Sequence, residues 1–116
     1  MSQDKINFSE SNIKLLTDLT ETLNTILVRD GFWVYTDLLE KIRIAAQSKN
    51  QDDFINFLID NALFGGSGAL WEIYIDNKNE RLEFNKIFCQ YIDQIKSMGI
   101  KNERINQVRE TLPLLV

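Results

Sequence analysis

Residues 63–75 read Leu-Phe-Gly-Gly-Ser-Gly-Ala-Leu-Trp-Glu-Ile-Tyr-Ile, and this stretch decides how the chain folds. Three of the chain's five glycines, Gly65, Gly66 and Gly68, fall here between two strongly apolar segments. Glycine has no Cβ and loses more backbone entropy in a helix than alanine does, so a continuous helix is unfavourable. We expect a tight turn in which Gly65 and Gly66, or Gly68, adopt positive φ angles and fold residues 69–75 back onto the preceding helix.

Helical periodicity surrounds this turn on both sides. Ser9 or Ser11, Asn50 and Asn102 are suitable N-terminal caps, and Gly31 and Gly99 are suitable stops. Residues 69–75 fit either a short helix or a strand, and the helix is preferred because a lone strand would have no partner. The spacing of apolar residues predicts helices over about 10–29, 32–46, 51–63, 69–75, 80–98 and 103–112.

The predicted fold class is therefore all-α. We expect one compact domain of five or six helices over residues 1–116, with residues 1–8 as a flexible polar lead-in. The 51–63 helix is apolar on most of its surface, so it and the long 80–98 helix are expected to form the centre of the packing.

Composition excludes several classes of protein. The chain has no histidine, which removes the commonest general base and the commonest metal ligand. Cys89 is the single cysteine and lies among apolar neighbours, so it is expected in the core. No apolar run reaches the roughly 20 residues of a membrane span, and the polar N-terminus resembles no signal peptide. We expect a cytoplasmic protein with no metal, no cofactor and no membrane contact.

Charge is unevenly distributed along the chain. The formal net charge is −4, and no lysine or arginine occurs between Lys49 and Lys78. A field of this sign repels nucleic acid and favours a basic protein partner. The acidic residues in this interval are Asp52, Asp53, Asp60, Glu72 and Asp76.

The glycine turn and the acidic pairs each have a simpler structural explanation than a catalytic one. A phosphate loop needs a preceding strand and a lysine after its last glycine, whereas Ala69 and Leu70 follow here. Asp52 and Asp53 fit the first turn of a helix, where carboxylates complement the helix dipole. Glu72 and Asp76 form an i, i+4 pair expected on an exposed face, and no third polar group accompanies either pair. A small enzyme is therefore the minority hypothesis.

Aromatic residues lie close to these acids. Trp71 and Tyr74 follow the glycine turn, and aromatic side chains are enriched at protein interfaces. They are equally suitable as core anchors, which is the expectation for Trp33 and Tyr35. The candidate partner-binding residues are Asp52, Asp53, Asp60, Trp71, Glu72, Tyr74 and Asp76.

Residues 33–75 resemble a family of small bacterial helical proteins classed as a domain of unknown function. In that family a tryptophan-led helix, a polar link and a leucine-rich helix precede a Phe-Gly-Gly-Met-Gly-Ser-Leu-Asn-Asp signature. This chain differs at Ser67, Ala69 and the Trp71-Glu72 pair. It agrees with the family pattern at Trp33, Leu39, Ile42, Phe64, Gly65, Gly66, Gly68, Leu70 and Asn85.

The chain is also similar in size, acidity and helical class to the immunity proteins of bacterial contact-dependent growth-inhibition systems, which bind and neutralise a cognate toxin domain. The resemblance implies binding to a toxin with a basic surface, a nuclease for example, because a nuclease must present cationic groups to phosphate. The alternative is a helical adaptor or regulatory subunit of a larger bacterial assembly. An upstream toxin-carrying gene would favour immunity, and an enzyme operon would favour the adaptor.

Overall fold

A computed structural model describes residues 5–115, and this part of the chain contains helices and loops but no strand. The all-α prediction is confirmed. The α-helices are α1 (Glu10–Arg29), α2 (Thr36–Gln47), α3 (Gln51–Leu58), α4 (Asn61–Phe64), α5 (Lys78–Ser97) and α6 (Glu103–Thr111). Three short 3-10 helices complete the structure: η1 (Trp33–Tyr35), η2 (Leu70–Glu72) and η3 (Leu112–Leu115).

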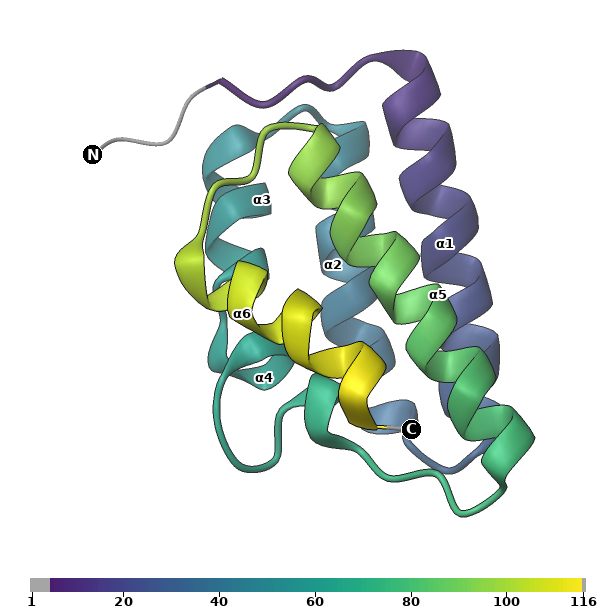
Figure 1. The fold of residues 1–116 in the computed structure, drawn as a ribbon. Helices are drawn as coiled ribbons and strands as arrows, with labels where there is room; N and C mark the ends of the chain where they lie inside the picture. Colours follow the sequence, from purple (N-terminus) through teal and green to yellow (C-terminus); the bar gives the residue numbers. More distant parts are fainter. Residues whose placement is uncertain (1–4, 116) are drawn as a thin grey trace.

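Helix α1 is the centre of the packing, and it lies antiparallel beside α5 with α2 behind it (Figure 1). The most extensive contacts in the described chain are those of α1 with α5 and with α2, whereas α3 packs mainly against α2. The expectation that the 51–63 helix is central was therefore wrong. The expectation for the long helix was right, since Phe84, Phe88 and Tyr91 of α5 are buried in the core.

Side-chain caps set most helix boundaries. Ser9, Asn50 and Asn102 each accept a hydrogen bond from the backbone N–H three residues later, as predicted. Asn77 does the same for α5, which therefore begins two residues earlier than predicted. The predicted 51–63 helix is broken, because Asp60 has an extended backbone and its carboxylate accepts a hydrogen bond from the N–H of Ala62 at 2.8 Å. Asp60 thus begins a new helix, α4.

The beginning of the described chain is packed rather than flexible. Ile6 is 2% exposed, and its N–H donates to the side chain of Gln51 at 2.7 Å. The N–H of Asn7 donates to the carbonyl of Met98 at 2.8 Å, and the ring of Phe8 meets Phe54 edge to face. The expected flexibility of residues 5–8 was therefore wrong, because two apolar side chains and two hydrogen bonds fix them. Residues 1–4 lie outside the described part of the chain.

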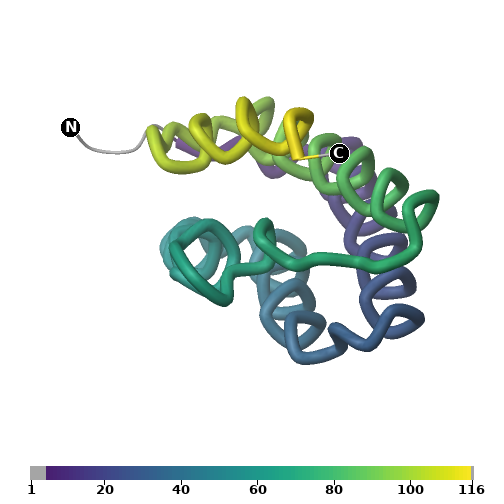
Figure 2. Tube along the Cα trace, turned by 60° about the horizontal axis from the view of Figure 1, so that its bottom comes forward, coloured from purple at the N-terminus to yellow at the C-terminus, as the bar shows by residue number. Residues whose placement is uncertain are grey.

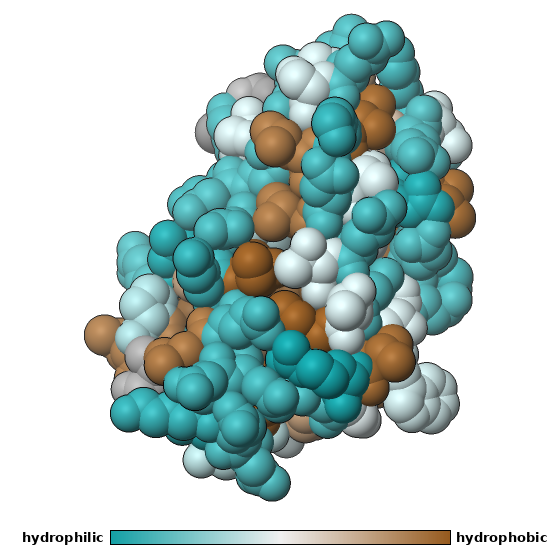
Figure 3. Space-filling view, turned by 90° about the vertical axis from the view of Figure 1, so that its right-hand side faces the viewer, coloured by the Kyte–Doolittle hydropathy of each residue, from teal (hydrophilic) through white to brown (hydrophobic). Residues whose placement is uncertain are grey.

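The outer surface is mostly hydrophilic where α1 and α5 face solvent. Figure 3 shows this face, on which separate apolar areas interrupt a largely polar covering. The exposed apolar side chains of these two helices include Leu15, Val28 and Leu82. Within residues 5–115, no helix is both long and apolar enough to cross a membrane.

Candidate interaction surface

The chain between α4 and α5, residues 65–77, contains the glycine turn and the predicted aromatic site, and is called here the α4–α5 segment. Figure 2 shows it running from α4 across the molecule to the start of α5. Ala69, Leu70 and Ile75 are buried and anchor the segment to the core. Only residues 70–72 form a short helix, so the predicted 69–75 helix is limited to the single turn η2 and is followed by extended chain.

Two glycines of this segment are required for different reasons. Gly68 has a φ angle of +87°, which confirms the positive φ predicted for that position. Gly65 instead has an ordinary φ of −77°, and a Cβ there would lie 2.5 Å from the carbonyl oxygen of Asn61. Gly66 has no positive φ, and open space surrounds the position of its absent Cβ. The turn therefore depends on the backbone angle at Gly68 and on close packing at Gly65.

Side-chain donors hold the carbonyl groups of the turn. The hydroxyl of Tyr35 donates to Gly68 O at 2.6 Å, and the indole N–H of Trp71 donates to Gly65 O at 2.7 Å. Arg104 of α6 donates from Nε to Phe64 O at 2.7 Å and from Nη2 to Gly65 O at 2.9 Å. Side chains from three other positions thus replace the regular hydrogen bonds that this segment lacks.

Two arginines cover the aromatic rings that were expected to face a partner. The guanidinium of Arg104 lies 5.5 Å from the ring centroid of Trp71, and that of Arg81 lies 4.7 Å from the ring centroid of Tyr74. Both distances fit cation–π contacts. No basic residue occurs between Lys49 and Lys78 in the sequence, but the fold brings Arg81 and Arg104 into contact with this interval. Nothing in the sequence pairs Arg104 with Trp71, because 33 residues separate them.

The fold separates the predicted acidic residues into two groups. Asp52 and Asp53 lie in the first turn of α3 at one end of the molecule, whereas the α4–α5 segment crosses the other end (Figure 1). Asp60 is occupied as the cap of α4. Glu72 is exposed on η2, and Asp76 is exposed next to α5. The candidate residues therefore do not form one surface, although Trp71, Glu72, Tyr74 and Asp76 remain on one segment.

The structure places the turn after α1 beside the α4–α5 segment. Tyr74 and Asp76 share a hollow of about 310 Å³ with Asp30, Phe32 and Glu80. Trp33, Val34 and Tyr74 are 68%, 66% and 65% exposed, although Trp33 was expected in the core. Trp33 and Val34 follow Phe32 directly and precede Tyr35, which bonds to Gly68, so they also lie next to the segment. The turn–loop surface is defined here as Asp30, Trp33, Val34, Tyr74, Asp76 and Glu80.

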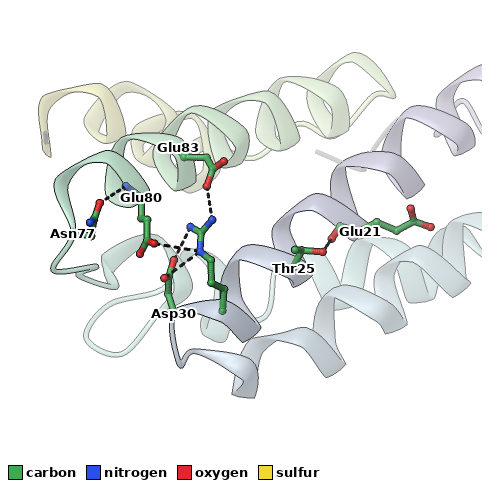
Figure 4. Close-up of polar contacts among 7 residues, drawn as sticks. Glu21, Thr25, Asp30, Asn77, Glu80 and Glu83 are labelled. Carbon is green, nitrogen blue, oxygen red and sulfur yellow. Dashed lines mark hydrogen bonds and ion pairs between the residues drawn. The ribbon is translucent and has the colours of Figure 1, made fainter.

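One guanidinium forms ion pairs with three carboxylates at the edge of this surface. Figure 4 shows Asp30, Glu80 and Glu83 turned toward one guanidinium. This group belongs to Arg29, whose nitrogen atoms lie 2.9 Å from Asp30, 3.7 Å from Glu80 and 2.9 Å from Glu83. The hydrogen bond from Arg29 lowers the pKa of Asp30, whose side chain is 7% exposed. The neighbouring Asp30 carboxylate raises the pKa of Glu80. Negative charge is therefore in excess here.

Two further ionisable groups, Cys89 and Tyr91, lie partly or fully inside the protein. Burial raises the pKa of the half-buried Cys89, against the weaker opposing influence of Arg109. Burial also raises the pKa of Tyr91, whose hydroxyl has no hydrogen-bond partner. Among residues 5–115, no three cysteine, aspartate or glutamate side chains are grouped so that they could hold a metal ion.

Comparisons with protein-family models, with curated proteins and with solved structures found no match to this chain.

Proposed function

We propose that this chain is an immunity protein, which binds a basic toxin domain of a bacterial growth-inhibition system and blocks its active site or substrate groove. The observation that carries the proposal is the turn–loop surface, where the exposed Tyr74 shares a hollow with the carboxylates of Asp30, Asp76 and Glu80. The exposed Trp33 follows Phe32, another residue of this hollow, in the chain. Exposed apolar side chains that gather in one patch are typical of interaction sites.

The aromatic side chains supply the contact energy. Tryptophan and tyrosine are the residues most enriched among those that dominate binding at interfaces. Val34 adds apolar area beside Trp33, and the η1 turn holds both of them because Tyr35 is bonded to Gly68. Trp33 takes the role that the sequence assigned to Trp71, since Trp71 is partly buried under Arg104.

The carboxylates supply selectivity for a basic partner. Arg29 bridges Asp30, Glu80 and Glu83, and Asp76 lines the same hollow as Asp30 and Glu80. A toxin that acts on nucleic acid presents lysine and arginine side chains to phosphate, and those cations would meet the exposed carboxylates of Asp76 and Glu83 here. Charge of this kind accelerates association and excludes acidic partners.

Co-expression with a toxin domain, taken from the neighbouring reading frame where that frame encodes one, tests the proposal. We expect the chain to rescue growth and to form a complex with that domain. Trp33→Ala and Tyr74→Ala should each weaken binding by about 30-fold, the loss typical of a dominant interface aromatic. The matched control is Asp52→Asn with Asp53→Asn, which removes two carboxylates at the other end of the molecule and should leave affinity unchanged.

The outcomes separate the two candidate functions. If the chain neither binds the neighbouring toxin nor restores growth, the immunity proposal is wrong. Binding to the products of an enzyme operon, at the same surface, would instead support the adaptor alternative. Equal losses from the aromatic variants and from the Asp52/Asp53 control would show that a different face makes the contact.

A further inference from the structure

We propose that Arg81 is a positioning residue that holds the outward side of residues 73–77 in one conformation, so that Tyr74 meets the partner already ordered. This inference rests on the proposed function, because Tyr74 belongs to the turn–loop surface. Arg81 lies in the first turns of α5, directly after the segment that it contacts.

Three contacts of Arg81 carry the proposal. Its Nη1 donates to Ile75 O at 2.7 Å and to Asp76 O at 3.3 Å, and its guanidinium carbon lies 4.7 Å from the ring centroid of Tyr74. One side chain therefore fixes two consecutive carbonyl groups and one face of the ring. A ring held in this way loses less conformational entropy when a partner covers it.

Other anchors hold this stretch at its ends and on its inner side. The N–H of Ile73 donates to Leu70 O, and Asn77 caps α5. Ile75 is buried, whereas Tyr74 and Asp76 on either side of it are exposed, as alternation in extended chain requires. Arg81 adds a restraint on the exposed side, where it contacts the Tyr74 ring.

The planar shape of the guanidinium explains why an arginine is suited to this role. A guanidinium can stack on an aromatic face while its N–H groups donate in its own plane. A lysine ammonium at the same place is a flexible point charge and cannot cover the ring and bridge both carbonyl groups together. Replacing Arg81 by lysine therefore keeps the positive charge and loses the geometry of the contacts.

Backbone ¹⁵N relaxation of the free protein is the first test. In the native chain we expect order parameters for residues 74–76 close to the rigid value of about 0.85. Arg81→Gln and Arg81→Lys should both lower them below about 0.6, the range of flexible backbone. Lys78→Gln is the matched control, because it removes a positive charge from the same end of α5 without touching Tyr74. Unchanged order parameters in Arg81→Gln, or native values in Arg81→Lys, would overturn the proposal.

A double-mutant cycle with the neighbouring toxin domain tests whether Arg81 acts through Tyr74. We expect Arg81→Gln to weaken binding about tenfold in the native chain and to cost nothing further in a Tyr74→Ala background. A merely structural role would cost the same in both backgrounds and would contradict the proposal. If the toxin does not bind the native chain at all, the proposed function is wrong, while the relaxation result still decides whether Arg81 orders the segment.

Discussion

The α1–α5 pair and the α4–α5 segment are stabilised in different ways. In the pair, hydrogen bonds follow the helices, and side chains such as Leu16, Leu23 and Phe88 are completely buried. At the segment, carbonyl groups are held by individual side chains, those of Tyr35, Trp71, Arg81 and Arg104. Stability is thus concentrated in the pair, and the shape of the proposed binding surface depends on single polar contacts.

Substitutions in the pair should therefore unfold the protein, whereas substitutions in the segment should only change the shape of its surface. The hydrophobic effect has no preferred direction, so the helical pair tolerates small shifts of its side chains. It does not tolerate truncation of a buried side chain, because a cavity remains. Hydrogen bonds from a side chain to a carbonyl require geometry and contribute about 1 kcal/mol each. The segment can therefore lose its conformation while the core remains folded.

The largest expected effect is in the helical pair. Leu23→Ala removes a side chain that is fully buried in α1 and should lower the free energy of unfolding by about 2–5 kcal/mol, because a cavity remains. Urea denaturation measures this. Leu15→Ala on the same helix is the control, since Leu15 is largely exposed and its loss should change stability by less than about 0.5 kcal/mol. Equal effects would show that α1 is not the centre of the core.

The next largest effects on the free energy of unfolding are expected from alanine substitutions at Gly65, Gly66 and Gly68, and the three should differ in size. Gly65→Ala should cost about 1–3 kcal/mol, because the new Cβ meets the Asn61 carbonyl in tight packing. Gly68→Ala should cost about 1–2 kcal/mol from the positive φ alone, since space around it is open. Gly66→Ala should be neutral or stabilising by up to about 1 kcal/mol. Thermal melting of the three variants measures the order, and Gly66→Ala as the most damaging change would contradict this account.

Local sequence signals predicted much of the fold. Caps at Ser9, Asn50 and Asn102 and stops at Gly31 and Gly99 depend on a few neighbouring residues, and all five are present as predicted. The break at Asp60 was missed because the apolar periodicity continues through it, and only the capping bond shows that a new helix begins. Which helix is central depends on how faces pair in space, which periodicity does not determine.

The candidate surface was less predictable, for a physical reason. Tyr74 and Asp76 could be selected because aromatic and acidic residues occur together in one short stretch. Trp33 was missed because an apolar aromatic at the start of an amphipathic helix usually faces the core, whereas η1 turns it outward. The two arginines that cover Trp71 and Tyr74 were missed because their contacts arise only when α5 and α6 are in place.

A smaller effect is expected when α6 is disconnected from the segment. Arg104→Gln removes the donors to Phe64 O and Gly65 O and the cation over Trp71, and should cost about 1 kcal/mol of unfolding free energy. The indole of Trp71 still holds the Gly65 carbonyl, so the loss is partial. Arg43→Gln is the control, because Arg43 pairs with Glu40 on the same helix, α2. Amide hydrogen exchange should accelerate around residues 65–71 only in Arg104→Gln.

The smallest expected effect is a dependence of stability on pH at the Arg29 cluster. Asp30 has a pKa below its ordinary value of 3.8, so its contribution to stability is complete above that value and is lost as the pH falls through the lowered pKa. Glu80 has a pKa above its ordinary value of 4.5, so its contribution is complete below that value and is lost as the pH rises through the raised pKa. Stability should therefore fall in acid, when Asp30 is protonated, and fall again as the pH rises and Glu80 loses its proton.

Two variants separate these contributions. In Glu80→Gln the decline of stability above pH 4.5 should disappear, because the Asp30 carboxylate no longer has a second charge beside it. In Asp30→Asn the loss in acid should diminish, because Arg29 then holds only Glu80 and Glu83. Both effects should shrink in high salt, since Arg29, Glu80 and Glu83 are substantially exposed. Denaturation midpoints between pH 3 and pH 7 test this. Identical pH profiles for the native chain and both variants would show that the cluster does not contribute to the pH dependence of stability.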